Sequence, residues 1–513
     1  MEPLIPAKIT PMESHAARHE MLDALKDAFL GLRTSYPLAD DTTAERTYLD
    51  SAASNLRLKV AHDIVEDALT HYANTHSQLH YGARIMTETY ERAHEIMLDF
   101  VGASEDYTAI FCGSGVTSGL NRAARVLTAQ RPERDVVITT LMEHHANDLP
   151  HRKHAGEVVH VPLETDPDGE AGRVDTAALR TAIREHGDRL NYVAVTGASN
   201  VTGITNPIHE IARLAHDVGA LIVVDAAQSA AHTPLHVSGA SDGEQLDVVC
   251  LSGHKIYAPG SPGVLITRKE LFAGHEPEVV GGGIVERVEK DRYMITDTLP
   301  KREEAGTPNI PGALLLAATL YCMGRVGMDV IEEDERRLTQ YALERFDDVP
   351  GLHLYGSHRL EVADRIGVLS FNLEHLPHGL VAAALNDYFG IAMRNQCFCA
   401  QPFVRRLLGR AGAGGAGDSC LDGTDLDATP DRSDRQPGMV RASLGLYNTE
   451  ADIDRAVDAL TDIATRPQFY REHYRPVNDG SGDWVHRSFS FDVEAAFNIE
   501  AAVDARLETM RAS

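Results

Sequence analysis

The stretch Leu246-Asp247-Val248-Val249-Cys250-Leu251-Ser252-Gly253-His254-Lys255 is an apolar run that leads into a polar turn ending in lysine. An earlier apolar run, Leu221–Val224, leads directly into Asp225. Both runs have the length and the β-branched content of buried strands. We therefore expect two neighbouring strands whose carboxyl ends bring Lys255 and Asp225 to one edge of a sheet.

A lysine and an aspartate in this arrangement suit a site for pyridoxal phosphate (PLP). The lysine forms a Schiff base with the aldehyde of PLP. The aspartate keeps the pyridine nitrogen protonated, so that the ring can accept electrons from a bound amino acid. The alternative is a surface lysine after a strand and an aspartate that caps a helix, and each residue taken alone favours this alternative.

Apolar, β-branched runs alternate with helical patterns, such as Pro207–Val218, through the middle of the chain. Such alternation predicts an α/β fold with a parallel sheet covered by helices. The strand candidates are Thr108–Cys112, Val136–Thr140, Tyr192–Thr196, Leu221–Val224, Val248–Leu251 and Gly263–Thr267.

The chain of 513 residues is long enough for two or three structural units. We expect an N-terminal extension over residues 1–45 that packs with the small domain, and a large PLP-binding domain over 46–328. A smaller α+β domain follows over 329–466, and a C-terminal extension over 467–513. Within the small domain, residues 411–437 are rich in Gly, Asp and Ser, which predicts a flexible insertion.

The overall composition is that of an ordinary globular protein, 43% hydrophobic and 24% charged. A formal net charge of −28 argues against a nucleic-acid or an anionic-membrane partner. We find no apolar run of transmembrane length and no secretory signal pattern. Six cysteines in so long a chain form no disulfide framework, so we expect free thiols in the cytoplasm.

Small and amide residues follow other strand candidates. Gly113-Ser114-Gly115-Val116-Thr117 lies between a strand and a helical run, where backbone N–H groups can approach a phosphate. Asn200 and Gln228 each follow a strand, so both would reach the same crevice. Each of these features alone is also explained by an ordinary turn or a loop-stabilising amide.

In their order along the chain, these motifs resemble those of the class V aminotransferase family of fold-type I PLP enzymes, and specifically the cysteine desulfurases and selenocysteine lyases. The resemblance runs from about Tyr48 to Leu460. It implies a large domain with a mostly parallel seven-stranded sheet between helices, plus a smaller α+β C-terminal domain. The motifs are YLDSAAS (48–54), EHHAN (143–147), SNVTG (199–203), VVDAAQS (223–229), SGHKIY (252–257), EAGTPN (304–309), CAQP (399–402) and RASLGLYNT (441–449).

The resemblance also implies roles for individual residues. Lys255 would be the Schiff-base lysine and would move the proton at the substrate α-carbon. Asp225 would pair with the pyridine nitrogen and His144 would stack on the ring. Asn200 and Gln228 would bond the ring oxygen and the substrate.

The phosphate and the substrate carboxylate would be held by further residues. Arg441 would clamp the substrate carboxylate, a task that a bidentate guanidinium suits, and Arg394 is a second candidate. Thr307 would reach a phosphate across a dimer interface, so the resemblance implies a homodimer. The other phosphate-binding candidates are Gly115, Val116, Thr117, Ser252 and His254.

Cys399 decides the subclass within the family. In desulfurases a thiolate takes the sulfur of the bound cysteine as a persulfide and leaves alanine, and Cys399 falls at that position. The alternative is a small buried hydrophobic residue. Cys397 departs from the family pattern, since a Cys-Phe-Cys segment also resembles molybdenum-cofactor sulfurases, so it could relay sulfur or only fill space. Cys420 lies in the insertion and is interpreted as a bystander thiol.

Histidine pairs also raise the possibility of a metal site. His76 and His80 have i,i+4 spacing, but no cysteine or carboxylate pattern completes a recognisable site. With 25 histidines, chance pairs are expected, so we predict no metal. The same judgement covers His71, His144, His145, His151 and His154.

The resemblance thus implies a homodimeric PLP-dependent transferase that converts L-cysteine to L-alanine. The persulfide on Cys399 would pass to an acceptor protein for iron–sulfur cluster assembly or thio-cofactor synthesis. Selenocysteine could replace cysteine as substrate. Two alternatives stay open: a C–S lyase or other PLP enzyme of specialised metabolism, and a catalytically silent sulfur carrier with the same fold.

Overall fold

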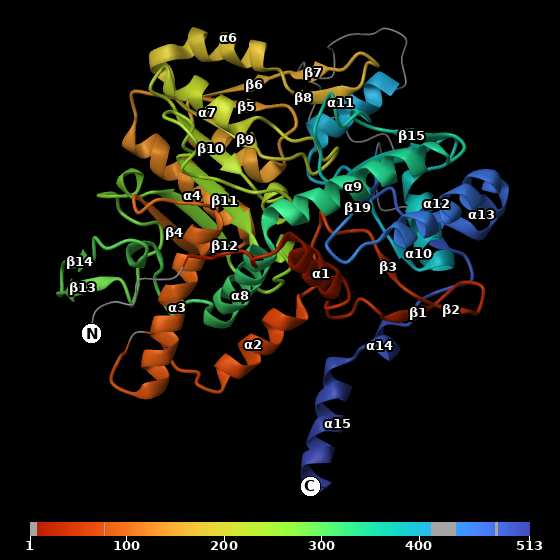
Figure 1. The fold of residues 1–513 in the computed structure, drawn as a ribbon, viewed down its shortest axis with the longest axis horizontal. Helices are drawn as coiled ribbons and strands as arrows, with labels where there is room; N and C mark the ends of the chain where they lie inside the picture. The colour runs from red at the N-terminus through yellow and green to blue at the C-terminus, as the bar shows by residue number, and fades with distance from the viewer. Residues whose placement is uncertain (1–7, 76, 412–437, 478–480, 513) are drawn as a thin grey trace.

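The computed structural model describes residues 8–75, 77–411, 438–477 and 481–512 (Figure 1). Its centre is a seven-stranded sheet in the order β4-β12-β11-β10-β9-β5-β6. Only β12 runs antiparallel to its neighbours, and the other adjacent pairs are parallel. The predicted fold class is therefore confirmed. The strands are β4 (Tyr107–Cys112), β5 (Val136–Thr140), β6 (Glu157–Val161), β9 (Leu190–Thr196), β10 (Leu221–Asp225), β11 (Val248–Ser252) and β12 (Gly263–Arg268).

Both faces of this sheet are buried, which explains why its strands read as continuous apolar runs rather than as alternating ones. Ile222 and Val224 of β10 pack into one hydrophobic cluster, whereas Leu221 and Val223 pack into another on the opposite face. The first cluster includes helices α2 (Lys59–Leu69), α3 (Tyr81–Phe100), α6 (Thr176–His186), α7 (Ile208–His216) and α8 (Ile310–Val326). The second is covered by α4 (Gly115–Gln130).

A second, antiparallel sheet follows α8 in the order β15-β16-β19-β18. It packs with helices in a hydrophobic cluster that is separate from those of the large sheet. On this ground we propose that the large and small domains divide near residue 328. The elements are β15 (Leu352–Leu354), β16 (Val368–Leu373), β18 (Arg394–Gln396) and β19 (Met439–Ser443), with α9 (Met328–Asp347), α10 (His378–Phe389) and α12 (Glu450–Thr465). Of the insertion predicted at 411–437, residues 412–437 lie outside the described residues.

The N-terminal segment contacts both units. Leu22 and Leu25 of α1 (His15–Lys26) belong to the hydrophobic cluster of the large sheet. The hairpin that follows lies against the smaller unit, because Ala39 N donates to Asp387 O at 2.7 Å. Its strands are β1 (Ser35–Pro37) and β2 (Thr43–Glu45), and β3 (Thr47–Tyr48) pairs next with β17 (Ile391–Ala392).

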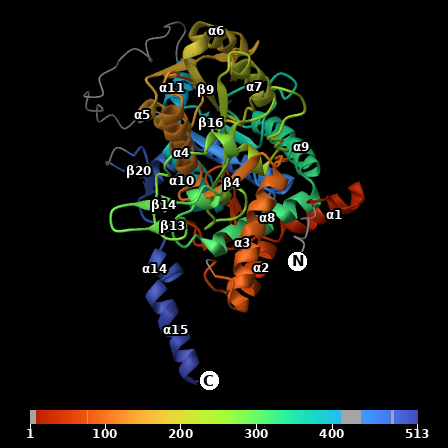
Figure 2. The same cartoon turned by 90° about the vertical axis from the view of Figure 1, so that its left-hand side faces the viewer.

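The C-terminal segment begins with a short helix, continues as a hairpin packed on α10, and ends in a helix that stands clear of the body (Figures 1 and 2). Its elements are α13 (Pro467–His473), β20 (Tyr474–Pro476), β21 (Trp484–His486), α14 (Val493–Ala496) and α15 (Ile499–Ala512). The remaining elements are α5 (Leu149–His154), β7 (Leu163–Thr165), β8 (Ala171–Val174), β13 (Val285–Val288), β14 (Tyr293–Ile295) and α11 (Gln401–Ala411).

Within the described ranges, no single helix is long and apolar enough to span a bilayer, and α8 and α9 pass that test only as a pair bent by 80°. The five cysteines in this part of the chain form no disulfide with one another.

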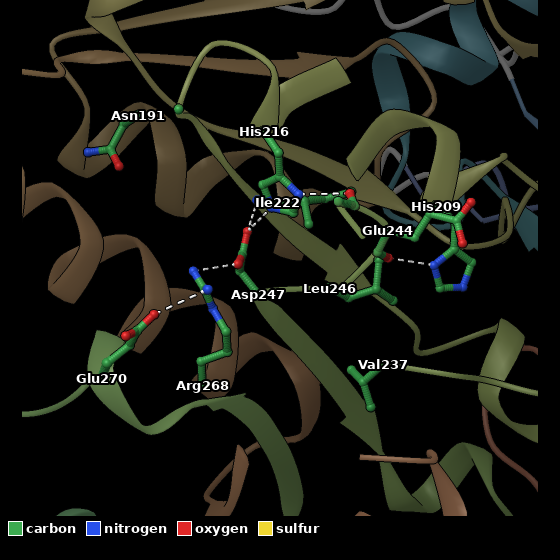
Figure 3. Close-up of polar contacts among 12 residues, drawn as sticks. Asn191, His209, His216, Ile222, Val237, Glu244, Leu246, Asp247, Arg268 and Glu270 are labelled. Carbon is green, nitrogen blue, oxygen red and sulfur yellow. Dashed lines mark hydrogen bonds and ion pairs between the residues drawn. The ribbon is translucent and has the colours of Figure 1, made fainter. Parts of the chain in front are cut away.

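A buried carboxylate holds the amino end of the central strands together (Figure 3). Asp247, directly before β11, is fully buried and accepts from Ile222 N and from His216 Nε2, both at 2.8 Å. It also pairs with Arg268 of β12 at 2.8 Å. Burial opposes protonation of His216, but the hydrogen bond and the charge of Asp247 outweigh burial and raise its pKa.

We predict that replacing His216 with Gln destabilises the protein mainly at acidic pH. Because the pKa of His216 is raised on folding, its contribution is complete below the unfolded value of about 6.5 and is lost as the pH rises through the folded value. The Tm should fall by several degrees near pH 6 and by much less near pH 8.5. His209→Gln is the matched control, since Nδ1 of His209 bonds the Glu244 carbonyl instead of a carboxylate. Equal losses at both pH values would contradict this.

Candidate active site

A cavity of about 280 Å³ lies at the carboxyl edge of the large sheet, between it and the smaller unit. The residues that line it come from both units, because the loops after β4, β5, β9, β10 and β11 meet the strands β18 and β19 there. It gathers every predicted site residue except Thr307. The lining residues are Ala52, Ala53, Ser114, Gly115, Val116, Thr117, His144, Thr196, Ala198, Asn200, Asp225, Ala227, Gln228, Ser252, His254, Lys255, Arg394, Phe398, Cys399 and Arg441.

The amino end of α4 forms one wall of the cavity. Gly115 has φ +55°, and a Cβ at this position would lie 2.5 Å from Ser252 Oγ. Glycine is therefore required by conformation and by space. Val116 N donates to Ser252 Oγ at 2.9 Å, which joins the helix start to the end of β11. A helix amino terminus with free N–H groups favours a bound anion.

Lys255 and Asp225 lie on neighbouring strand ends. Asp225 is the last residue of β10, and Lys255 ends a short 3-10 turn directly after β11. Burial raises the pKa of Asp225, whose Oδ1 accepts from Ala227 N at 2.9 Å, and the positive charge of Lys255 acts in the opposite direction. Burial lowers the pKa of Lys255 to about 8, although Asp225 opposes this change. The lysine can therefore lose its proton near neutral pH.

The turn after β5 places an uncharged histidine in the cavity. Burial, together with the charge of Lys255, lowers the pKa of His144 to about 3. Its Nδ1 accepts from Ala146 N at 3.0 Å, which fixes the ring orientation. Glu143 anchors the turn by accepting a hydrogen bond from Asn147 Nδ2 at 2.6 Å. Burial raises the pKa of Glu143 to about 8.

Two amide side chains also line the cavity. Gln228 Nε2 donates to Ala52 O at 2.9 Å. Asn200 Nδ2 donates to Phe398 O at 2.7 Å, whereas its Oδ1 is buried and has no hydrogen-bond partner. An unpaired buried acceptor costs free energy, so it is a position that a bound molecule would satisfy.

Arg441 is the buried cation of the smaller unit. Burial lowers its pKa to about 10, against the effect of Asp50. Its Nη1 donates to Asn200 O at 2.9 Å, its Nη2 lies 3.4 Å from Asp50 Oδ1, and its guanidinium lies 4.6 Å from the centroid of the Phe398 ring. Arg394 is more exposed and lies 4.0 Å from Asp50. Asp50 is thus the carboxylate with which a bound anion would compete.

Cys399 is exposed and lines the cavity on a loop with unusual backbone conformation. Gln396, Phe398 and Cys399 all have positive φ, of 89°, 51° and 55°. Such residues persist only where surrounding contacts hold them. Here Cys399 O accepts from His145 N at 2.8 Å, and the Asn200 amide holds the preceding carbonyl. Cys397 is half-buried among apolar residues, and burial raises its pKa.

The structure places one predicted residue away from this cavity, and adds others that we did not assign. Thr307 is exposed, and Asn74 Nδ2 donates to its Oγ1 at 3.3 Å. Asp50, Phe398 and Glu143 received no role from the sequence, although each lies in or beside a quoted motif. The sequence signal for these three residues is their position in or next to a motif. No spacing rule predicts that Asp50 contacts Arg441, which lies 391 residues later in the chain.

The histidine pairs in the sequence raised the possibility of a metal site. In the part of the chain that the structure describes, the three-residue group with potential ligand atoms within 4.8 Å of one another is His15, His19 and Glu333. It belongs to none of the histidine sets considered above and does not line the cavity. His15 and His19 lie at ion-pair distances of 3.4 and 3.6 Å from Glu333.

The residues of the cavity fit PLP on three observations. The Gly115 turn at the start of α4 leaves room for a phosphate beside backbone N–H groups. A buried carboxylate, Asp225, lies close enough to Lys255 for each to affect the pKa of the other. The neutral His144 lines the same cavity as the unpaired Asn200 Oδ1.

A sequence model of the Aminotransferase class-V family matches residues 47–456. The chain belongs to the class V aminotransferase family. Members of this family are PLP-dependent enzymes, and this protein is one of them.

Relatives within the family are named cysteine desulfurases. A probable cysteine desulfurase from Halalkalibacterium halodurans is 32% identical over 439 residues, which are 84% of this chain and 96% of that protein. The apo structure of a cysteine desulfurase from Thermococcus onnurineus has a TM-score of 0.69 and 30% identity, over 82% of this chain and 95% of that one. The S-sulfonic acid form of an Escherichia coli cysteine desulfurase has a TM-score of 0.66 and 26% identity, over 89% and 99%.

We predict that Gly115→Ala weakens PLP binding at least tenfold, because its methyl group would displace Ser252 from the helix start. Gly113→Ala is the matched control in the same turn, since its Cβ would lie 3.7 Å from the nearest atom, an ordinary contact. The dissociation constant of PLP, measured by absorbance titration of the apoprotein, checks this. Equal affinities for the two variants would show that Gly115 is not required at the phosphate.

Proposed function

We propose that this protein is a cysteine desulfurase, which converts L-cysteine to L-alanine and takes the sulfur as a persulfide on Cys399. The observation that carries the proposal is that Cys399 lines the same cavity as Lys255 and Arg441. A nucleophilic thiol and an amino-acid site therefore share one space. The names of the relatives support the same reaction.

The proposed reaction balances without an external oxidant or reductant. The Cβ–S bond of the substrate breaks, and a bond forms between that sulfur and Sγ of Cys399. Of the two thiol protons, one stays on the persulfide and the other is taken up as Cβ becomes the methyl group of alanine. Bound PLP supplies the electron sink that makes the bonds of the substrate labile.

Residues around the cofactor supply the proton and the charge. With a pKa of about 8, Lys255 can both accept and return a proton at the substrate α-carbon near neutral pH. Asp225 would place its buried carboxyl group at the pyridine nitrogen, and the positive charge of Lys255 offsets part of the effect of burial on its pKa. His144, kept uncharged by its low pKa, would cover the face of the pyridine ring.

Arg441 is the proposed clamp for the substrate carboxylate. It is buried, so its charge is weakly screened, and Asn200 O and Phe398 fix its orientation. Binding of the carboxylate would replace the long contact of 3.4 Å to Asp50. Arg394 remains the second candidate, at the exposed side of the cavity.

The cofactor phosphate would lie at the start of α4, with Thr117, Ser252 and His254. We propose that Thr307 serves the corresponding site of a second subunit in a homodimer, and its exposure outside its own cavity supports this. We also propose that the protein acts in the cytoplasm. The persulfide sulfur would pass to an acceptor protein for iron–sulfur cluster or thio-cofactor synthesis. Selenocysteine is the alternative substrate with the same geometry.

The test is the rate of alanine formation from L-cysteine by PLP-loaded variants. Cys399→Ser should abolish it, because no thiolate remains to accept the sulfur. Cys397→Ser is the matched control two positions away, and it should keep most of the activity because Cys397 is half-buried with a raised pKa.

Other outcomes would favour the alternatives. Unchanged turnover of cysteine by Cys399→Ser, with pyruvate as product, would indicate a C–S lyase. If the wild-type protein binds no PLP and gives no visible absorption band, the catalytically silent carrier would replace the proposal. Activity with selenocysteine alone would identify a selenocysteine lyase.

A further inference from the structure

Two histidines of α1 and one carboxylate of α9 come together at the surface, away from the active-site cavity. His15 and His19 have i,i+4 spacing, which places both imidazoles on one helix face. Nε2 of His15 lies 3.4 Å from Oε2 of Glu333, and Nε2 of His19 lies 3.6 Å from the same oxygen. Three groups that can each bind a metal ion therefore converge within 4.8 Å of one another.

The two distances suit a shared ion better than direct hydrogen bonds. N–H···O hydrogen bonds in proteins are about 2.7–3.2 Å long, and both contacts of Glu333 are longer. Zinc binds imidazole nitrogen and carboxylate oxygen at about 2.1 Å in tetrahedral geometry, so that two ligands of one ion lie about 3.4 Å apart. The contacts of Glu333 with His15 and His19 match this edge of a tetrahedron.

Packing and ion pairs hold the two helices in this position (Figures 1 and 2). Leu22 of α1 is buried in the hydrophobic cluster of the large sheet. Nη1 of Arg18 lies 2.7 and 2.9 Å from the two carboxylate oxygens of Asp329. Further along α1, Nζ of Lys26 lies 3.0 Å from Oδ2 of Asp334. The three groups are thus carried by packed helices rather than by loops, so little ordering is needed when an ion binds.

The charges near the three groups permit a bound cation. Arg18 lies on the same face of α1 as both histidines and would repel an ion. Its guanidinium is paired with Asp329, however, which offsets that repulsion. The formal net charge of −28 also favours the approach of cations to the protein as a whole.

The donor types indicate the class of ion. Imidazole suits zinc, copper and nickel, whereas calcium and magnesium prefer oxygen ligands alone. Two histidines and one glutamate form a three-ligand set known from zinc sites that keep a fourth position for water. The side chains of His15 and Glu333 are 57% and 62% exposed, so solvent water can reach that position.

We propose that His15, His19 and Glu333 bind one zinc ion, or a similar divalent transition-metal ion, which fastens α1 to α9. Both histidines precede the family match at residues 47–456, so the ion would tie a segment outside the matched region to the first helix of the smaller unit. None of the three residues lines the active-site cavity, so binding of the ion does not depend on the reaction there.

The test is zinc binding by the untagged, PLP-loaded full chain, measured by isothermal titration calorimetry. The accessible thiols are first alkylated, because thiolates would compete for zinc. We expect one ion per chain at this site. Each of His15→Gln, His19→Gln and Glu333→Gln should weaken binding at least tenfold, because each removes one of three ligands.

His358→Gln is the matched control. His358 lies 4.0 Å from a single carboxylate of α9, that of Asp347, so it offers an imidazole beside a carboxylate without a second histidine. This variant should keep the wild-type affinity for zinc. The absorption band of bound PLP checks that each variant is folded.

Amide hydrogen exchange of residues 15–26 tests in the wild-type protein whether the ion fastens α1. Zinc should slow this exchange at least tenfold, and it should have no such effect in His19→Gln. The proposal would be overturned if the wild-type protein binds no zinc, if Glu333→Gln binds zinc as tightly as the wild type, or if zinc leaves the exchange of α1 unchanged. Two exposed ion pairs would then account for the contacts of Glu333.

Discussion

The active site depends on a pair of opposite charges, Asp225 and Lys255, held where water is largely excluded. Burial alone would neutralise both, since it raises the pKa of the acid and lowers that of the amine, and each group partly offsets the effect on the other. The parallel pairing of β10 and β11 fixes their proximity, with Asp225 opposite Cys250. A cofactor that needs a reactive amine and a carboxylate therefore finds both at one sheet edge.

The buried polar network around Asp247 and the active-site residues lie at opposite ends of the same strands. At the amino end, Asp247 joins β10, β12 and α7 through two hydrogen bonds and an ion pair with Arg268 (Figure 3). At the carboxyl end, polar atoms such as Asn200 Oδ1 are left without partners. The smaller unit then closes this end by bringing Arg441 and Cys399 over it.

The sequence predicts the elements that local pattern specifies. The apolar runs at 136–140, 221–224 and 248–251 became β5, β10 and β11, because burial on both faces demands continuous hydrophobic residues. The polar residues after them could be assigned to one crevice for the same reason. The sequence could not predict the contact of Asp50 with Arg441 or the positive φ of Cys399, since both arise from tertiary packing between distant segments.

The most direct test of the account is a single turnover of the PLP-loaded protein with L-cysteine, with identification of the small product and mass analysis of each cysteine peptide. The account predicts one alanine per active site and the mass of one added sulfur atom on the peptide that contains Cys399. Pyruvate, or no product, together with an unmodified Cys399 would contradict it.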